Sequence, residues 1–541
     1  MAKKAAAIPI KNSNTNENTT NSSNSAITYP PFTVSNTVLY GLTLALVAFY
    51  YLFSNTSDGF YQQDEAAHYV SMLNFWNNPN NIIGNWEKPG YKFIYVIPAL
   101  LGKPAVMLLN CIFSALSAFF AYRVAEKLQS KVPLLAFVFL AFQPLWAGLA
   151  FRNYSELISA FLLILTIYLY LSDKFLFSAL VASYICFIRQ EFYPILGLYF
   201  LWFAYRKQFI PALALSVFPM IHNFWGMALT GDFLYLLHTI LGTSQKIGDA
   251  YQRAGFEHYF RFSAVIYGSI CLPLFVAYLA AKITQRQHPP YIALLPAVLY
   301  FLMYCIFNIQ SFPIGPSSAG NLRYLVIISP LVAVFAALAI DEMRNTENKI
   351  FILSSLAILA IIASVYMTYN HNFVRFNEEE RDWKILIGLF FSSILLIIPL
   401  TTQQYTYSFS GLVLFITLIT LKPIKLSEED KTCKIVAEWY QNYEKANGEP
   451  QVLYHHDMFS YYLNKPKGSF KTPVQFISEE NAKKLPKGSL ILWESHYSYR
   501  PELRKTDVTY EFFTSKPQEY ELIQQFVSAD ERFGTLIFRK L

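Results

Sequence analysis

The stretch RYLVIISPLVAVFAALAID, residues 323–341, contains no charged residue between its initial arginine and its final aspartate. An apolar run of about 20 residues can cross the hydrocarbon core of a bilayer as a helix. Runs of this kind recur through most of the chain. They predict about thirteen transmembrane helices, at 37–54, 104–122, 134–151, 157–172, 174–188, 191–205, 208–225, 262–281, 291–308, 323–341, 349–368, 385–400 and 406–421.

The composition separates a membrane part from a soluble part. Only 15% of the 541 residues are charged and 54% are hydrophobic, whereas a soluble domain carries roughly 25% charged residues. Residues 422–541 alone hold 18 of the 43 Lys and Arg residues and 17 of the 36 Asp and Glu residues. A single soluble fold, a disordered protein and a fibre are therefore excluded. We predict an all-α polytopic membrane domain followed by a small α+β C-terminal domain.

Three regions follow from this division. Residues 1–36 are rich in Asn, Ser and Thr and cannot bury a core, which predicts a disordered cytoplasmic tail. Residues 37–421 form the predicted membrane domain, with a long outside loop at 55–103. Residues 422–541 form the soluble domain, in which apolar stretches alternate with Pro, Gly and Lys turns. This pattern predicts a helix at 428–446 and strands at 451–454, 490–493 and 535–538.

Basic residues in the short loops predict the orientation. With a cytoplasmic N-terminus, Lys and Arg recur in nearly every short inside loop, as the positive-inside rule requires. These residues are Arg123, Lys127, Lys131, Lys174, Arg206, Lys207, Lys282, Arg286, Arg344 and Lys349. An odd number of spans then puts loop 55–103 and the C-terminal domain outside. We interpret the net charge of +7 as this bias and expect no nucleic-acid partner. The tail composition and short spans favour a bacterial inner membrane.

Ionisable residues gather on the predicted outer face. They lie in loop 55–103 and at the outer ends of later spans: Asp64, Glu65, Lys88, Arg152, Glu156, Arg189, Glu191 and Arg323. Charged residues at membrane depth are costly, and by default they mark a functional site. A convergent set at one face predicts a single polar cavity.

The residues of the first outside loop also have structural interpretations. Asp64 and Glu65 could be a solvated loop pair, or paired carboxylates that divide the roles of base and positioner. In a helix, Asp64 and His68 would lie one turn apart. Lys88 could be an interfacial lysine or a point cation for a phosphate.

The later residues leave similar alternatives open. Arg152 and Glu156 are four residues apart, so one helical face could present a structural ion pair. The Arg189-Gln190-Glu191 segment could be a short loop. Arg323 opens a span after a Pro/Gly-rich loop at 312–316, where a cation suits a lipid-linked phosphate. The sequence has no glycine-rich phosphate loop and no serine-elbow motif, so nucleotide binding and serine hydrolysis lack support.

The order of these motifs resembles the membrane-embedded C-type glycosyltransferases, especially the aminoarabinose transferases and protein O-mannosyltransferases. Those proteins carry an Asp-Glu pair in the first outside loop, and the pair here is Asp64-Glu65. A Lys-Pro-Pro element then opens an apolar run. The chain has Lys88-Pro89-Gly90, so the second proline is lost.

Two further motifs extend the resemblance. An Arg followed by an Asp at the start of a span corresponds to Arg152 and Glu156, with Glu in place of Asp. Arg323-Tyr324 followed by Pro330 resembles an Arg-Tyr…Pro element late in these enzymes.

The resemblance covers the order of elements over roughly residues 40–340. It implies the C-type glycosyltransferase fold and an inverting transfer of a sugar from a polyprenyl phosphate to a lipid, glycan or protein acceptor on the outer face. In that reaction Asp64 would be the general base and Glu65 its catalytic neighbour. The donor phosphate would be bound by Lys88, Arg152 and Arg323. Positioning of the acceptor or a metal would fall to Glu156, His68, Glu191 and Tyr324. No cofactor is required by the motifs, and a divalent cation stays open.

Two other functions remain open from the sequence. A transporter or flippase of lipid-linked sugars could use the same charges to bind a head group without chemistry, although it should show internal repeats and broken helices. Alternatively, the C-terminal domain could be a binding module on an inert membrane anchor.

Overall fold

The computed structural model describes residues 30–60, 62–84, 86–248, 254–308, 320–369, 383–465, 476–501 and 504–541. Most of the predicted disordered tail and the loop at 312–316 lie outside these ranges. Residues 30–35, the end of that predicted tail, instead contact the bundle. The Phe32 amide donates to the carbonyl of Lys131 at 2.8 Å, and Thr402 Oγ1 donates to the carbonyl of Pro30 at 2.7 Å.

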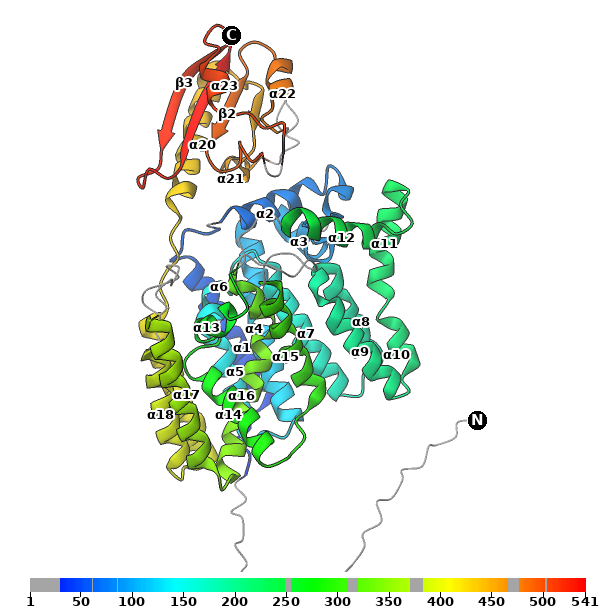
Figure 1. Ribbon diagram of the computed structural model, residues 1–541, viewed down its shortest axis with the longest axis vertical. Helices are drawn as coiled ribbons and strands as arrows, with labels where there is room; N and C mark the ends of the chain where they lie inside the picture. The colour runs from blue at the N-terminus through cyan, green and yellow to red at the C-terminus, as the bar shows by residue number, and fades with distance from the viewer. Residues whose placement is uncertain are drawn as a thin grey trace, which may run out of the picture.

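A helical bundle forms the larger part of the molecule, and the C-terminal domain lies at one end of it (Figure 1). In chain order, the bundle consists of α1 (Asn36–Ser54), α2 (Gln63–Asn74), η1 (Pro79–Ile82), α3 (Pro89–Leu100), α4 (Lys103–Lys127), α5 (Pro133–Ala141), α6 (Pro144–Leu149), α7 (Ser155–Leu171), α8 (Phe175–Ile188), η2 (Gln190–Phe192), α9 (Tyr193–Tyr205), α10 (Phe209–Ala214), α11 (Val217–Thr230), α12 (Tyr235–Gly248), α13 (His258–Tyr267), α14 (Cys271–Thr284), α15 (Tyr291–Phe307), η3 (Leu322–Ile328), α16 (Ser329–Asn345), α17 (Lys349–Tyr369), α18 (Trp383–Ile397) and α19 (Thr402–Thr420). The segments labelled η are 3-10 helices.

Every apolar run predicted from the sequence is helical, but the prediction of about thirteen spans is not confirmed. Among the described residues, four helical segments are long and apolar enough to cross a membrane: α1, α4, α10–α11 and η3–α16. A fifth is possible if α13 and α14, bent by 114°, are one span. Glycine and proline divide the other runs, since α13 ends at Gly268 with a φ of +85° and α6 begins at Pro144. The apolar helices identify an integral membrane protein.

The stretch 323–341 lies at the centre of this bundle. Its most apolar window, in η3–α16, is 89% buried, against 28% for α1. Alanines 333, 336, 337 and 339 are all inaccessible, and α16 packs against α14, α5 and α4. Small side chains allow this close approach of helices. The run is therefore apolar on all sides because protein, not lipid, surrounds most of it.

Three of the five loops with the predicted inside charges meet at one end of the bundle. Ser130 Oγ donates to Asp341 Oδ2 at 2.9 Å, Arg123 contacts Asn36, and Lys282 pairs with Glu342. The start of α1 and the ends of α4, α14 and α16 thus share one end of the bundle. The orientation of that end toward the cytoplasm stays a prediction.

The C-terminal domain contains α20 (Glu428–Asn447), β1 (Val452–Tyr454), α21 (Asp457–Leu463), α22 (Glu479–Lys484), β2 (Leu490–Glu494), α23 (Glu511–Thr514), β3 (Tyr520–Val527) and β4 (Gly534–Lys540). The sheet has the order β1-β2-β4-β3, with β1 parallel to β2 and the other pairs antiparallel. One helix and three strands match the sequence patterns. Strand β3 was not predicted, because its register is irregular between Leu522 and Gln524 and only one of its eight residues is buried.

The C-terminal domain is docked on the bundle. Helix α21 packs against α2, and the ring of Tyr461 in α21 contacts those of Phe60 and Tyr69 at centroid distances of 5.6 and 6.0 Å. Lys103 donates to the carbonyl of Tyr461 at 2.9 Å and lies 3.5 Å from the centre of its ring. Met458 belongs to the same apolar core as the bundle helices. The domain therefore contacts the same helix that carries Asp64 and Glu65.

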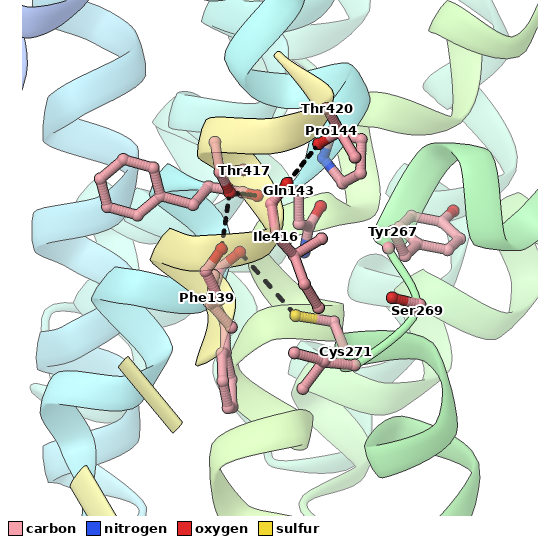
Figure 2. A pocket seen from close by; sticks show the side chains of 13 residues that line it. Phe139, Gln143, Pro144, Tyr267, Ser269, Cys271, Ile416, Thr417 and Thr420 are labelled. Carbon is pink, nitrogen blue, oxygen red and sulfur yellow. Dashed lines mark hydrogen bonds between the residues drawn. The ribbon is translucent and has the colours of Figure 1, made fainter. Parts of the chain in front are cut away.

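A small cavity lies where two broken helices meet. Its volume is about 30 Å³, enough for roughly one water molecule. Figure 2 shows Gln143 beside the α5–α6 break, Ser269 and Cys271 beside the α13–α14 break, and Thr417 from α19. Thr417 Oγ1 donates to the carbonyl of Phe142 at 3.2 Å. No Asp, Glu, Lys, Arg or His is among the residues that line this cavity, so it is separate from the charged residues predicted to form a site.

Candidate functional site

The residues predicted to converge come from five separate elements. Asp64 and Glu65 lie in the first turn of α2, and Lys88 precedes α3. The others lie around the start of α7, around η2 and in η3: Arg152, Glu156, Arg189, Glu191 and Arg323. Helices α2 and α3 lie across the end of the bundle that faces the C-terminal domain (Figure 1). The ion pairs described next join five of these residues into one network: Asp64, Glu156, Arg189, Glu191 and Arg323. Glu65 and Arg152 form a separate pair beside it, and Lys88 makes no ion pair with a described residue.

Arg323 is the centre of this network. Its Nη2 lies 2.7 Å from Asp64 Oδ2, and its Nε lies 3.4 Å from Glu156 Oε1. The guanidinium also lies 4.2 Å from the centre of the Tyr154 ring and 5.5 Å from that of Tyr324. Glu156 is inaccessible, whereas the Asp64 side chain is 42% exposed. Asp64 is therefore the carboxylate of this pair that a ligand from outside can reach.

Glu65 is held rigidly beside Asp64. Its carboxylate accepts from Arg152 Nη2 at 2.5 Å and from the backbone amide of Asn153 at 3.0 Å, and it is inaccessible. Asn153 Nδ2 also donates to the carbonyl of Glu65 at 2.9 Å. The expectation that Arg152 and Glu156 share a helical face is wrong, because α7 begins only at Ser155. The pairing of Arg152 with Glu65 instead joins α2 to the turn before α7.

Arg189 joins Glu156 to Glu191 in the buried part of the network. Its Nη1 lies 2.8 Å from Glu156 Oε1, and its Nη2 pairs with Glu191. Tyr304 donates to Glu191 at 2.8 Å, and the Tyr324 ring lies 5.0 Å from the guanidinium. Arg189 joins α8 to the 3-10 helix η2, in which Glu191 lies, and both charges are part of the network.

Lys88 differs from the other cations because it has no carboxylate within 4.0 Å in the described part of the chain. It precedes Pro89 and has a left-handed backbone, with φ of +54°, at the start of α3. Burial lowers the pKa of its amine to about 8, although the nearby charge of Glu156 raises it. Arg189 and Arg323 also lower it, so Lys88 lies within electrostatic range of both guanidinium groups. The charge of Lys88 is available to an anionic ligand.

Gly90 stands where the resembling family has its second proline. A Cβ at this position would lie 2.9 Å from Phe187 Cδ1 and 3.0 Å from the Phe187 backbone. The Tyr184 hydroxyl donates to the carbonyl of Gly90 at 2.8 Å. The absence of a side chain lets α3 approach α8, which fixes the segment that begins with Lys88.

His68 packs among aromatic rings and does not pair with Asp64. Its ring stacks on Trp86 at 4.8 Å and meets Tyr91 edge-on at 5.7 Å. Burial, together with the charges of Lys92 and Lys88, lowers its pKa well below the ordinary value. A neutral, buried imidazole here is suited to packing.

Sequence reasoning missed four residues of the site: Trp86, Asn153, Tyr154 and Tyr304. Tyr154 contacts both Arg152, at 2.9 Å from its hydroxyl, and Arg323. The only sequence signal for it was its place two residues after Arg152. Tyr304 lies inside an apolar run and gave no signal.

The residues suggested for positioning a metal are engaged by arginines. Glu65 and Glu156 are each engaged by an arginine, and within the described ranges no group of three or more His, Cys, Asp or Glu side chains could hold a metal ion. A cation would have to displace an arginine from a buried carboxylate, which is costly.

No family model matches the sequence, and no curated protein matches it. Solved structures do match the fold. The crystal structure of ArnT from Cupriavidus metallidurans bound to undecaprenyl phosphate is similar with a TM-score of 0.56 and 12% identity, over 93% of this chain and 98% of that one. The apo structure of the same protein gives 0.57 and 13% over the same shares. The resemblance stated from the motifs is thus confirmed at the level of fold: nearly the whole chain has the architecture of ArnT.

Proposed function

We propose that this protein is an inverting glycosyltransferase that uses a polyprenyl-phosphate-linked sugar as its donor. The observation that carries the proposal is the exposed carboxylate of Asp64, which pairs with Arg323. Lys88, which has no carboxylate within 4.0 Å in the described ranges, lies within electrostatic range of the same arginine. Nucleophilic substitution at an anomeric carbon needs a base for the acceptor and positive charge for the departing phosphate. The similarity of fold to a protein whose crystal structure holds undecaprenyl phosphate supports the same donor class.

The donor phosphate would be bound by Lys88 and Arg323. Lys88 supplies a point charge, and Arg323 supplies a planar donor group. Arg323 is paired with Asp64 at 2.7 Å before the donor arrives. A phosphate would compete for this guanidinium and so leave the Asp64 carboxylate free to accept a proton. Arg152 contributes indirectly, because its bond to Glu65 holds α2 in place.

The transfer then needs one displacement. Asp64 removes the proton from an acceptor hydroxyl or amine as that group attacks the anomeric carbon. The bond from the anomeric carbon to the phosphate oxygen breaks, and its electron pair leaves with the polyprenyl phosphate. Attack on the side opposite the leaving group inverts the configuration. The rigid Glu65 positions Asp64, while Glu156 and Glu191 hold the guanidinium groups of Arg323 and Arg189.

The reaction would take place at the end of the bundle that bears the C-terminal domain. We propose that this end faces the outside of a bacterial inner membrane, where a lipid, glycan or protein could serve as acceptor. The reaction as written uses only side chains of this chain and no cofactor.

The test is sugar transfer by the purified Asp64→Asn variant from a radiolabelled polyprenyl-phosphate sugar. The amide keeps the size of the side chain but cannot accept the proton, so we expect at least a hundredfold loss, in the range of a general base. Asp530→Asn is the matched control, since Asp530 accepts a hydrogen bond from Ser528 in the turn between β3 and β4 of the C-terminal domain and should leave transfer unchanged. Full activity of Asp64→Asn would eliminate the proposed base.

A flippase for lipid-linked sugars is distinguished by its products. Transfer releases free polyprenyl phosphate with every turnover, whereas movement across the membrane leaves the donor intact. Release that depends on both an acceptor and Asp64 supports the enzyme; movement of intact donor without release supports the flippase.

A further inference from the structure

Trp86 is an exposed aromatic residue beside the charged network. It lies in the turn before α3, two residues from Lys88, and 44% of its surface is accessible. Two residues of chain span at most about 7 Å, so the indole originates close to the ammonium-bearing residue. None of the ion pairs described above uses this ring. It is therefore a large exposed group at the site to which the proposed reaction has given no role.

Two buried side chains of the bundle contact the indole ring. His68 of α2 stacks on it at 4.8 Å with an angle of 28° between the rings, and Lys92 Nζ of α3 lies 5.2 Å from its centre. Both residues are buried, with 2% and 0% of their surfaces accessible. The indole thus keeps a large accessible surface although side chains of α2 and α3 contact it.

The supports are themselves fixed. Lys92 Nζ donates to Ser71 Oγ at 2.8 Å and pairs with Glu87, whose carboxylate accepts from Ser71 at 2.8 Å. His68 is one helical turn after Asp64 on α2. The same helix thus carries the exposed carboxylate and the imidazole that supports the indole, so the ring is preorganised relative to Asp64.

We propose that the accessible surface of Trp86 is the platform on which the sugar of the donor stacks. The inference rests on the proposed function, because the phosphate at Lys88 brings the sugar to this ring. The faces of a pyranose carry weakly polarised C–H groups, which pack against the negative face of an aromatic ring. Stacking would hold the anomeric carbon between the phosphate and Asp64.

The test compares two kinds of probe on the purified full-length chain. One is undecaprenyl phosphate, and the other is a set of undecaprenyl phosphates that carry a hexose or a pentose. Wild type should bind its preferred sugar-bearing lipid about tenfold more tightly than the bare lipid phosphate. Trp86→Ala should lose this preference and keep its affinity for bare undecaprenyl phosphate, and Trp86→Phe should keep part of it.

Trp76 provides the matched control. It is 49% exposed, lies just beyond the other end of α2, and donates from its indole to the carbonyl of Val96 at 3.1 Å. Trp76→Ala should leave both affinities unchanged. The inference is overturned if Trp86→Ala keeps the preference, or weakens both probes equally. A wild-type protein that binds no undecaprenyl phosphate at all would instead refute the proposed function.

Discussion

The charge state of Lys88 predicts how donor binding should depend on pH. Burial lowers the pKa of this amine to about 8, so about 90% of it is charged at pH 7 and about 10% at pH 9. If only the ammonium form binds the phosphate, the apparent affinity falls with the charged fraction. We therefore expect binding of undecaprenyl phosphate to be about tenfold weaker at pH 9 than at pH 7. The sign follows from the cation, which is present below the pKa and lost above it.

Equilibrium binding of labelled undecaprenyl phosphate to detergent-purified protein, measured from pH 6.5 to pH 9.5, tests this prediction. A phosphate monoester loses its second proton near pH 6, so the charge of the probe changes little between pH 7 and pH 9. The decisive variant is Lys88→Arg, because a guanidinium stays charged throughout and should remove the decline above pH 7. Lys88→Met should bind weakly at every pH. A decline that persists in Lys88→Arg, or a flat wild-type profile, would refute the role of Lys88.

The remaining predictions concern the frame of the site. Arg152→Met leaves the inaccessible carboxylate of Glu65 without its charge partner and should lower the free energy of unfolding by about 3–5 kcal/mol, measured by thermal unfolding. Arg123→Met is the control: its partner Glu126 is 38% exposed, so the loss should be about 1 kcal/mol or less. Gly90→Ala places a Cβ about 3.0 Å from Phe187, so it should lower the free energy of unfolding by about 1–3 kcal/mol and weaken donor binding. Gly84→Ala is the control: the atom nearest to its Cβ would lie at 3.5 Å, so stability and donor binding should both stay unchanged. EDTA should leave sugar transfer unchanged, because arginines engage the buried carboxylates; activity lost to EDTA and restored by Mg²⁺ or Mn²⁺ would contradict this.

The pairing of charges could be predicted only in part. The sequence indicated that eight ionisable residues share one face, since each lies in the first outside loop or at the outer end of an apolar run. It could not indicate which carboxylate Arg152 pairs with. The partner is Glu65, 87 positions away and at 2.5 Å, and not the nearby Glu156. Spacing along the chain predicts contacts only inside a continuous helix, and α7 begins after Arg152.

The loss of the second proline is explained in the same way. From the sequence, Gly90 is only a departure from the Lys-Pro-Pro pattern. In the structure it is the point where α3 approaches the backbone of Phe187, a residue almost a hundred positions later. A close approach between distant segments leaves no local signal apart from the glycine itself.

Hydropathy and charge alone determined that the chain is a membrane bundle with a charged C-terminal domain, because the cost of placing charge in hydrocarbon is a local property of each residue. They also determined the helical stretches and helix α20. The tertiary structure decided which helices are broken, which apolar run lies at the centre, and which carboxylate stays exposed. These features depend on packing between segments far apart in the sequence, and burial of Glu65 and Glu156 but not of Asp64 arises only when those segments meet.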